Sequence, residues 1–479
     1  MTPRVVVVGG GITGLALAGT LADDARRRGA ALDLTVLDAG ARPGGHAQTR
    51  HEHGYVVEAG PNGFLNREPH TMALVESLGL NPRLVEARPE SKRRFIVRDG
   101  RLCQVPDGPK TLVTTPALSW RAKLRLLREP FIPGTDGAAD ESVHAFAARR
   151  IGDEAADMLV DAAVSGISAG DSRRLSVRAQ FPIMAEMERD HGSLVRAMFA
   201  RRGKRTGGPT RLLSFDRGMG TLTSALAECL GDRLRLGATV RGISRVGVGD
   251  EGGRRGPAWQ VTLADGRRVE AEHVVLTVAA RAAAPMLAAH DAALASELAA
   301  IEYAGLTVVA LAYKTTDMPR PLDGYGYLTT RPEALATLGV VWESSLFPGR
   351  APEGHVLLRV MLGGSRRPDI VSTPEAQVVA LARTDLQQVL GVTAQPAHTW
   401  TFAWPEAIAQ YTLGHVERVV AIRERLARQA GLMICGTSYD GVSFNHAVKH
   451  GRQTALELGE RLWPGSAAPT VEPVLQEMA

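Results

Sequence analysis

The segment from Arg4 to Gly45 decides the fold, and it reads RVVVVGGGITGLALAGTLADDARRRGAALDLTVLDAGARPGG. Its four consecutive valines, Val5 to Val8, predict a buried parallel strand. A glycine-rich turn follows, an amphipathic helix is expected from Thr13 to about Arg28, and a second strand from Leu34 to Leu37 ends on Asp38. This order is the fingerprint of a dinucleotide-binding site: a strand, a G-x-G-x-x-G turn, a helix, and a second strand that ends in an acid.

Each glycine of the turn has its own task in such a site. Gly9 permits the tight turn, Gly11 lets the backbone approach a pyrophosphate, and Gly14 lets helix and strand pack closely. The helix N-terminus offers free N–H groups and partial positive charge to the phosphates, and Asp38 accepts hydrogen bonds from ribose hydroxyls. The fingerprint alone does not separate FAD from NAD.

Two further glycine loops lie close behind. Arg42-Pro43-Gly44-Gly45 resembles the Arg-x-Gly-Gly loop of the FAD-dependent amine-oxidase-like superfamily, which passes over the pyrophosphate and the ribityl chain. An ordinary turn is the alternative interpretation. Gly60 to Gly63 follow a short strand from Tyr55 to Glu58, and such a loop brings bare backbone against a flat ligand face.

The composition bounds the class of protein. With 479 residues, 44% of them hydrophobic, the chain is long enough for two or three domains. The net charge of +5 comes mostly from arginines spread along the chain, so we expect no nucleic-acid partner. Three isolated cysteines indicate a reducing, cytoplasmic compartment. No signal peptide is expected, and the apolar runs fall short of the ~18 residues of a membrane-spanning helix.

Two stretches combine cations with apolar residues. In Ser91 to Val97, three consecutive cations precede a strand, and alternation along a strand would aim one of them into a cavity; a solvated face is the alternative. Residues 111–205 are rich in helix patterns. Within them, Ser119 to Arg128 predicts a basic amphipathic helix with a tryptophan, which suits either a membrane interface or an ordinary protein surface.

The later part of the chain returns to the nucleotide domain. Arg233 to Val240 and His273 to Val278 read as strands, whereas Leu306 to Leu362, which includes VVWESSLFP, predicts an antiparallel sheet at the floor of a substrate cavity. Leu432 to Cys435 and a helix that starts near Asn445 form a second strand-glycine-helix unit. The N-terminus of that helix would stabilise the negative charge of a reduced flavin.

We therefore predict an α/β fold with a discontinuous Rossmann-type FAD-binding domain, an antiparallel-sheet substrate domain and an inserted helical domain. The expected segments are, in chain order, FAD-binding 1–88, substrate 89–110, inserted helical and membrane-facing 111–208, FAD-binding 209–298, substrate 299–425 and FAD-binding 426–479.

Motifs of acid–base, nucleophilic or metal catalysis are missing from the sequence. It contains no G-x-S-x-G elbow, no Walker loop and no H-E-x-x-H. His46, His51 and His53 cluster too irregularly for a metal site. A flavin carries its own redox chemistry, so we assign no catalytic residue and expect no metal.

Together these segments resemble the protoporphyrinogen oxidase family, the oxygen-dependent FAD enzymes of haem synthesis. The resemblance covers nearly the whole chain and keeps the family's order. Its most specific segments are SGISAGDSRRLSVRAQFP and QYTLGH; the others are GGGITGLALA, GYVVEAGPNGFLNREP, KRRFIVRDGRL, GYGYLTTR, RVMLGGS and GTSYDGVSFN. It implies a six-electron oxidation of protoporphyrinogen IX to protoporphyrin IX, with oxygen reduced to hydrogen peroxide.

The resemblance also assigns site residues. Arg94 matches a cation that binds a substrate propionate, and Gly166, Leu328 and Met361 match positions that line the macrocycle pocket. The residues matched to FAD contacts are Gly9, Gly10, Gly11, Ile12, Thr13, Gly14, Asp38, Ala39, Arg42, Gly44, Gly45, His46, Gly60, Pro61, Asn62, Gly63, the backbone of Val240, Val442, Ser443 and Phe444.

The sequence departs from the family pattern at four positions. Asp38 replaces the commoner Glu, Ala409 stands where Pro is usual, and His446 stands where Asp is common. Glu68 falls where some relatives that prefer coproporphyrinogen carry Lys. The alternatives are a coproporphyrinogen III oxidase, a diverged flavin oxidase or desaturase for another large apolar substrate, and a non-catalytic FAD or porphyrin carrier. Monomer and homodimer both stay open, as does peripheral contact with the inner face of the membrane.

Overall fold

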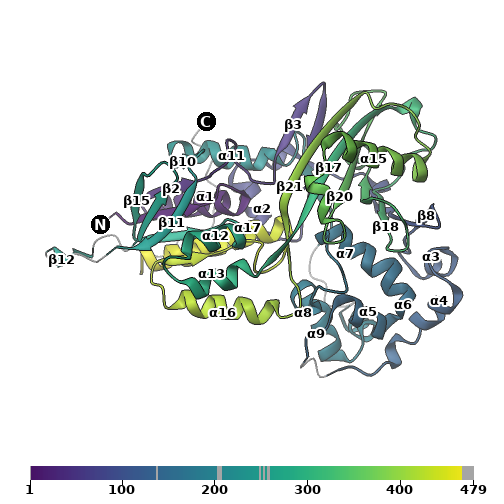
Figure 1. The fold of residues 1–479 in the computed structure, drawn as a ribbon, viewed down its shortest axis with the longest axis horizontal. Helices are drawn as coiled ribbons and strands as arrows, with labels where there is room; N and C mark the ends of the chain where they lie inside the picture. Colours follow the sequence, from purple (N-terminus) through teal and green to yellow (C-terminus); the bar gives the residue numbers. More distant parts are fainter. Residues whose placement is uncertain are drawn as a thin grey trace.

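The computed structural model describes residues 2–135, 139–201, 208–246, 250–251, 254–255 and 259–465. Figure 1 shows three regions: a region of strands and helices that holds the N-terminus, a long, mostly antiparallel sheet beside it, and a group of helices below that sheet. This mixed α/β architecture confirms the fold class predicted from the sequence.

The first region is built on a parallel sheet with the strand order β10-β2-β1-β16-β22. Its strands come from three separate stretches of sequence. Their bounds are β10 Leu234–Arg235, β2 Asp33–Leu37, β1 Arg4–Val8, β16 His273–Leu276 and β22 Leu432–Ile434.

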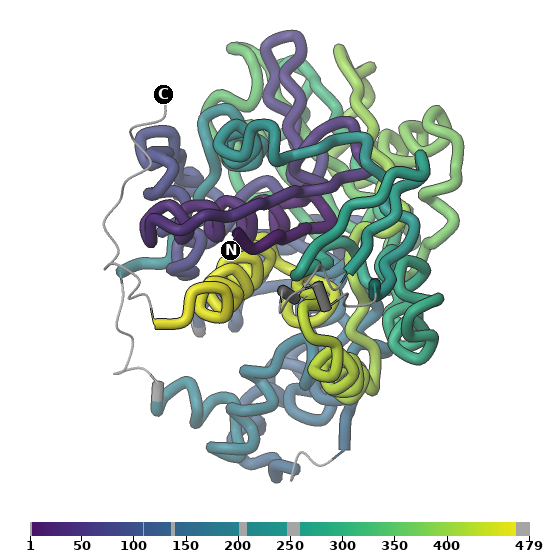
Figure 2. Tube along the Cα trace, turned by 90° about the vertical axis from the view of Figure 1, so that its left-hand side faces the viewer, coloured from purple at the N-terminus to yellow at the C-terminus, as the bar shows by residue number. Residues whose placement is uncertain are grey.

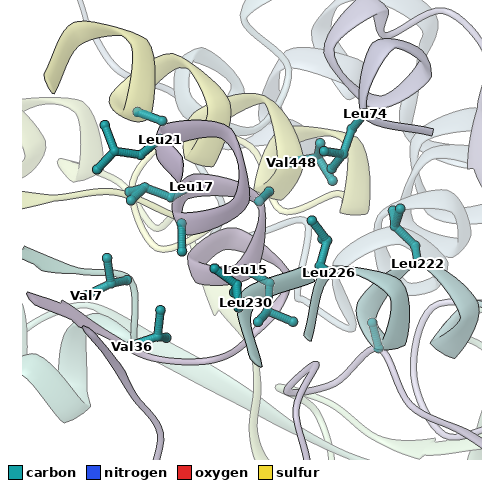
Figure 3. Packing of buried hydrophobic residues seen from close by; sticks show 14 of the residues in the cluster. Val7, Leu15, Leu17, Leu21, Val36, Leu74, Leu222, Leu226, Leu230 and Val448 are labelled. Atoms are coloured by element: carbon teal, nitrogen blue, oxygen red, sulfur yellow. The ribbon is translucent and has the colours of Figure 1, made fainter. Parts of the chain in front are cut away.

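Three helices cover one face of this sheet and share its core (Figure 3): α1 (Ile12–Arg27), α11 (Gly220–Leu230) and α17 (Phe444–Leu462). The valines and leucines of the sheet face and the helices are buried together there. A Cβ atom on Gly451 of α17 would lie 2.4 Å from the carbonyl oxygen of Thr13 on α1. Only glycine therefore permits the close approach of these two helices.

The opposite face is covered by a small antiparallel sheet and three helices. Their bounds are β11 Val240–Arg245, β14 Trp259–Leu263, β15 Arg268–Ala271, α12 Ala280–Leu287, α13 Ala292–Ala299 and α16 His415–Ala427. The prediction of one strand over 233–240 is wrong. The chain leaves the parallel sheet after Arg235, turns at Gly237 with φ +67°, and enters the small sheet at Val240.

The second region is a seven-stranded sheet in the order β21-β17-β20-β19-β18-β7-β8, antiparallel except for β18 and β7. Its strands are β21 His398–Gln410, β17 Glu302–Lys314, β20 His355–Gly363, β19 Thr337–Val341, β18 Gly326–Thr329, β7 Phe95–Arg98 and β8 Arg101–Gln104. Helix α15 (Glu375–Leu390) packs on one face. The segment VVWESSLFP is only partly strand, because β19 ends at Val341 and the short helix α14 (Glu343–Leu346) follows.

The third region is the inserted helical segment, which packs against the other face of the seven-stranded sheet. Figure 2 shows it apart from α17 and the parallel sheet. Its elements are α3 Pro109–Thr114, α4 Trp120–Leu126, α5 Val143–Ile151, α6 Asp153–Ala155, a π-helical turn Ala156–Val160, α7 Asp161–Ser168, α8 Val177–Gln180, α9 Pro182–His191 and α10 Leu194–Arg201. No helix among the described residues is long and apolar enough to cross a membrane.

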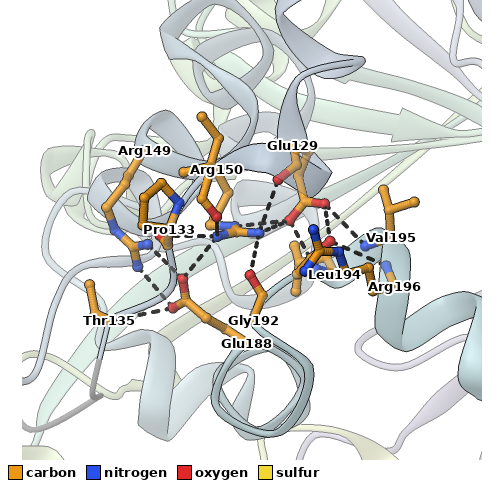
Figure 4. A network of polar contacts seen from close by, with 12 residues as sticks. Glu129, Pro133, Thr135, Arg149, Arg150, Glu188, Gly192, Leu194, Val195 and Arg196 are labelled. Atoms are coloured by element: carbon orange, nitrogen blue, oxygen red, sulfur yellow. Dashed lines mark hydrogen bonds and ion pairs between the residues drawn. The ribbon is translucent and has the colours of Figure 1, made fainter.

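A buried ion-pair network holds this helical region together (Figure 4). The fully buried Arg150 pairs with Glu129 and lies 3.3 Å from Glu188. Burial on its own raises the pKa of Glu129, but hydrogen bonds from the Ser193 hydroxyl and from Arg150 outweigh it and lower that pKa. Removing one member of such a buried set leaves its partner charged and unpaired, which costs about 3–5 kcal/mol.

The predicted domain boundaries stay predictions. Residues 202–207, near the end of the expected helical segment, and residues 466–479, at the end of the last FAD-binding segment, lie outside the described residues.

Candidate active site

The glycine turn predicted from the opening segment forms at the end of β1. Gly9 has φ +115°, and Gly11 precedes α1 without a side-chain cap. A Cβ atom on Gly14 would lie 1.8 Å from the carbonyl oxygen of Gly9, so only glycine fits there. The first N–H groups of a helix have no partner inside the helix, and α1 has no acid in its first turn. This end of α1 therefore presents free N–H groups and partial positive charge, which suit an anion.

Asp38 connects the end of β2 to the glycine turn. Its two carboxylate oxygens accept hydrogen bonds from the N–H groups of Gly10 at 2.5 Å and Gly40 at 2.6 Å. Each oxygen has further lone pairs, so these bonds hold the carboxylate in place and leave it able to accept from a ligand hydroxyl. Sequence reasoning missed Thr277, whose hydroxyl lies 3.0 Å from the carbonyl oxygens of both Val8 and Gly9.

The three glycine loops contact one another around the start of α1. The N–H of Gly44 donates to the carbonyl oxygen of Gly10 at 2.8 Å. A Cβ atom on Gly60 would lie 2.1 Å from the carbonyl oxygen of His46, so the third loop packs directly on the second. Trp404 of β21 packs edge-on against His46, with ring centroids 4.7 Å apart. The seven-stranded sheet thus reaches the glycine loops.

The C-terminal strand-glycine-helix unit reaches the same place. Ser443 caps α17 by accepting a hydrogen bond from a backbone N–H of its first turn, and the ring of Phe444 lies 5.9 Å from that of Phe64. A Cβ atom on Gly436, just after β22, would lie 3.9 Å from the side chain of Thr13. The two strand-glycine-helix units therefore meet at the start of α1.

The remaining predicted cofactor residues lie around these loops. Ala39, Arg42 and Gly45 are exposed at the rim, and Ile12 is half-buried in the first turn of α1. Val240 is buried at the start of its strand. Two residues earlier, the backbone N–H of Ala238 donates to the Asp38 carbonyl oxygen at 2.7 Å.

Arg94 lies just before β7, so the expectation that strand alternation orients it is wrong. The neighbouring Arg93 pairs with Asp323 at 2.7 Å. The guanidinium of Arg94 instead lies 5.3 Å from the centre of the Tyr325 ring, and no carboxylate among the described residues pairs with it. Arg94 is exposed and available to an anionic ligand.

A buried polar cluster connects the Gly60 loop to the ring under Arg94. Asn62 donates to Glu343 at 3.0 Å. Arg359 lies 3.4 Å from Glu343 and donates to the carbonyl oxygen of Gly60. The Tyr325 hydroxyl contacts Asn62, and burial raises the pKa of this hydroxyl. Sequence reasoning missed this cluster. A charged residue inside the apolar strand VLLRVMLGG was the available signal, because such a residue must have a partner.

The three residues predicted to line the macrocycle pocket come together at one face of the seven-stranded sheet, with Gly166 on the helix α7 that packs there. Leu328 pairs across the strands with Gly339, which in turn pairs with Met361, so the two side chains flank a position without a side chain. A Cβ atom on Gly166 of α7 would lie 2.6 Å from the end of the Leu328 side chain. The helix therefore closes directly over this apolar row.

A second buried charge pair lies just before the Gly60 loop. Arg350 is 3.5 Å from Glu58, both side chains are fully buried, and Arg350 donates to the Ser214 hydroxyl at 2.6 Å. Burial raises the pKa of Glu58 to about 7, although Arg350, Thr49 and the backbone N–H of Met219 each lower it. The carboxyl group therefore carries a proton in part at neutral pH.

Residues 12–458 match the family described as flavin containing amine oxidoreductase. The chain belongs to this family. A protoporphyrinogen oxidase of Homo sapiens is 32% identical over 495 residues, which cover 96% of this chain and 98% of that protein. A coproporphyrinogen III oxidase of Bacillus subtilis is 29% identical over 460 residues, covering 94% and 96%. These relatives confirm the resemblance drawn from the sequence motifs.

A solved structure supports the same relationship. A protein from Exiguobacterium sp. 255-15, provisionally described as a protoporphyrinogen oxidase, has a TM-score of 0.81 and 26% identity over 96% of this chain and 99% of its own. A reduced UDP-galactopyranose mutase shares the fold with a TM-score of 0.72 at 16% identity.

The residues of the site fit the flavin that the family implies. A Cβ atom on Gly11 would find Gly45 at 4.0 Å as its nearest neighbour, so the backbone is open to a phosphate at that point. Gly44, Gly45 and Gly60 of the neighbouring loops also lack side chains. In the part of the chain that the structure describes, no group of three or more His, Cys, Asp or Glu residues could hold a metal ion.

Proposed function

We propose that the chain binds FAD and oxidises a porphyrinogen to the porphyrin in tetrapyrrole and haem biosynthesis, with protoporphyrinogen IX as the substrate. The observation that carries this proposal is the apolar row of Leu328 and Met361 beside Gly166, on a sheet whose strand β7 follows Arg94, a cation that no carboxylate among the described residues pairs with. A porphyrinogen is a wide apolar ring with carboxylates on its rim, and such a ligand needs an apolar slot with a cation at the edge.

The chain's own residues bind and orient. The diphosphate of FAD would lie at the turn of Gly9 to Gly14 with the ribose on Asp38, and the flavin ring against Gly60 to Gly63. The start of α17, at Phe444, would place its positive end toward the reduced flavin. When bound, the flavin supplies hydride acceptance and electron transfer to oxygen. Three rounds remove six electrons and six hydrogens from one porphyrinogen, and three oxygen molecules become three hydrogen peroxides.

Orientation and affinity come from different residues. One charge-assisted bond from Arg94 to a propionate contributes about 1.5–3 kcal/mol and fixes which edge of the ring enters. The apolar row supplies most of the affinity, at roughly 25 cal/mol per Å² of apolar surface removed from water. Tyr325, held by Asn62, forms the surface on which the Arg94 guanidinium rests.

The proposal is tested by oxygen uptake. Purified protein should be yellow, and it should convert colourless protoporphyrinogen into a fluorescent porphyrin with one peroxide formed per oxygen consumed. A flavin-containing preparation that oxidises protoporphyrinogen no faster than the buffer does would refute the substrate. A preparation without any flavin would refute the cofactor as well.

Coproporphyrinogen III is the second candidate substrate, because the Bacillus relative carries that name. Its ring has four carboxylates, so acidic side chains at the binding site would repel it. Glu68 caps the helix α2 (Pro69–Ser77) by accepting from the backbone N–H of His70. A negative charge at this position, where some relatives that prefer coproporphyrinogen carry Lys, disfavours a substrate with additional carboxylates. We expect a higher kcat/KM for protoporphyrinogen than for coproporphyrinogen.

We further infer that the helical region contacts a membrane peripherally from the cytoplasmic side. Trp120, Leu124, Leu127 and Phe131 have 66%, 60%, 67% and 79% of their surface exposed, and Lys123 lies 4.7 Å from the Trp120 ring. Apolar rings beside cations suit the boundary between headgroups and acyl chains. The protein should float with vesicles that contain anionic lipid, and the double variant Trp120→Ser, Phe131→Ser should stay at the bottom of the gradient.

A further inference from the structure

The loop from Gly60 to Gly63 lies between two short strands, β4 (Tyr55–Glu58) and β5 (Phe64–Leu65). In the part of the chain that the structure describes, none of its backbone groups makes a hydrogen bond to another backbone group. A segment that lacks such bonds keeps one shape only when side chains or a ligand hold it. The shape of this loop therefore depends on the side chains around it.

A buried ion pair contacts the loop at two points. Arg359 of β20 donates to the carbonyl oxygen of Gly60. Glu343, the first residue of α14, accepts from the side-chain amide of Asn62 at 3.0 Å. The charged groups of Arg359 and Glu343 lie 3.4 Å apart, and both side chains are buried. The guanidinium thus holds the first residue of the loop, and its acid partner holds the third.

The seven-stranded sheet brings the two charges together. Arg359 pairs across the strands with Val341, the last residue of β19, and Glu343 follows two residues later. The Nε atom of Arg359 and one carboxylate oxygen of Glu343 have no hydrogen-bond partner among the described residues. The pair is therefore satisfied mainly by itself and by the loop. Separating a buried pair leaves an uncompensated charge, so the pair and the loop stabilise one another.

The loop turns one residue toward this pair and keeps the others nearer the surface. Asn62 is buried against Glu343, whereas Gly60, Pro61 and Gly63 are half-buried. The ion pair therefore holds the loop from its buried side. A ligand that lies against the half-buried residues meets backbone that is already fixed from behind.

We propose that Arg359, paired with Glu343, is a positioning residue that fixes the Gly60–Gly63 loop in the shape that receives the flavin ring. The inference rests on the proposed function, because that function places the flavin ring against this loop. Arg359 acts through the loop backbone. A loop that is already ordered loses little conformational freedom when the cofactor binds, and the cofactor is therefore held more tightly. Without Arg359, the binding of FAD must itself order the loop.

The test compares the affinity for FAD between the wild type and Arg359→Gln. The flavin-containing proteins are diluted stepwise, bound and free flavin are separated by ultrafiltration, and their ratio gives the Kd. We expect the Kd for FAD to rise about tenfold in Arg359→Gln, as for the loss of one hydrogen bond from a charged group. The visible circular dichroism of the flavin that stays bound should change as well. Arg359→Lys should recover part of the affinity, because lysine keeps the charge beside Glu343 but has fewer donors.

The matched control is Arg366→Gln. Arg366 follows the same strand and pairs with the fully buried Asp161 at 2.9 Å, so its loss also removes a partner from a buried acid. No hydrogen bond connects Arg366 to the Gly60–Gly63 loop among the described residues. Arg366→Gln should therefore keep the Kd and the flavin spectrum of the wild type.

An unchanged Kd for FAD in Arg359→Gln would overturn the inference, as would an equal rise in Arg366→Gln. If Arg359→Gln does not fold, Arg359→Lys decides by the same constant. If the wild type retains no flavin, the proposed cofactor fails and this inference falls with it. If the wild type retains FAD but oxidises no porphyrinogen, the proposed substrate fails, and the Kd values for FAD still decide the inference.

Discussion

Replacing Arg94 with alanine should raise KM for protoporphyrinogen and leave kcat almost unchanged. Its guanidinium rests on Tyr325 at 5.3 Å and has no carboxylate partner in the described part of the chain, so the change breaks no ion pair within the protein. A bond between charged groups is worth about 1.5–3 kcal/mol, and the exposure of Arg94 places it at the lower end. About 1.5 kcal/mol corresponds to roughly a tenfold rise in KM.

The assay is the initial rate of porphyrin fluorescence at several substrate concentrations, with flavin content measured in parallel. Arg93→Ala is the matched control, because Arg93 neighbours Arg94 and pairs with Asp323 instead. Arg94→Lys should lie between the wild type and alanine, since lysine keeps the charge and loses the two-pronged geometry. An unchanged KM in Arg94→Ala, or the same rise in Arg93→Ala, would remove Arg94 from the substrate site.

Three further predictions concern the first glycine turn, the buried acid Glu58 and the contact between Gly166 and Leu328. Gly14→Ala should fold and lose most of its flavin, because the added methyl group would lie 1.8 Å from the carbonyl oxygen of Gly9; flavin absorbance per protein measures this. Glu58 keeps its proton up to about pH 7 when folded but loses it near pH 4.5 when unfolded, so stability should fall as pH rises between these values, by at most about 3 kcal/mol. Urea unfolding of Glu58→Gln should show a flatter pH dependence than the wild type. Gly166→Ala should raise KM because its methyl group would meet Leu328 at 2.6 Å, and adding Leu328→Ala should relieve part of that rise.

Each of these outcomes has a clear opposite. Gly242 has open space around it and no positive φ, so Gly242→Ala should keep its flavin; equal loss in both glycine variants would point to a general folding defect. A wild-type protein whose stability changes no more between pH 5 and 7 than that of Glu58→Gln would contradict the raised pKa. Additive effects of Gly166→Ala and Leu328→Ala would mean that the two residues do not meet in the working enzyme.

The nucleotide half could be predicted because its signals are local. The valine strand, the spaced glycines and the acid at residue 38 lie within one short segment, and β1, α1 and β2 formed within one residue of the expected bounds. The second unit, at β22 and α17, was recognised for the same reason. Short-range patterns of this kind express backbone requirements that few other residues satisfy.

The substrate half could be predicted only in outline, since its contacts are long-range. Arg94 depends on Tyr325, and Arg359 depends on Gly60, across hundreds of positions in the sequence. Apart from the family resemblance that singled out Arg94, the sequence offered only a run of cations and a charged residue in an apolar strand. Which cation is paired within the chain and which is left for a ligand depends on the fold, and periodicity carries no information about it.

The most direct test of the central claim is anaerobic mixing of the purified yellow protein with protoporphyrinogen, followed by flavin absorbance in a stopped-flow instrument. We predict rapid loss of the oxidised flavin band at a rate that saturates with substrate, and its return when oxygen is admitted. Coproporphyrinogen in a parallel run should bleach the flavin more slowly. A flavin band that stays oxidised with both porphyrinogens would contradict the proposed function.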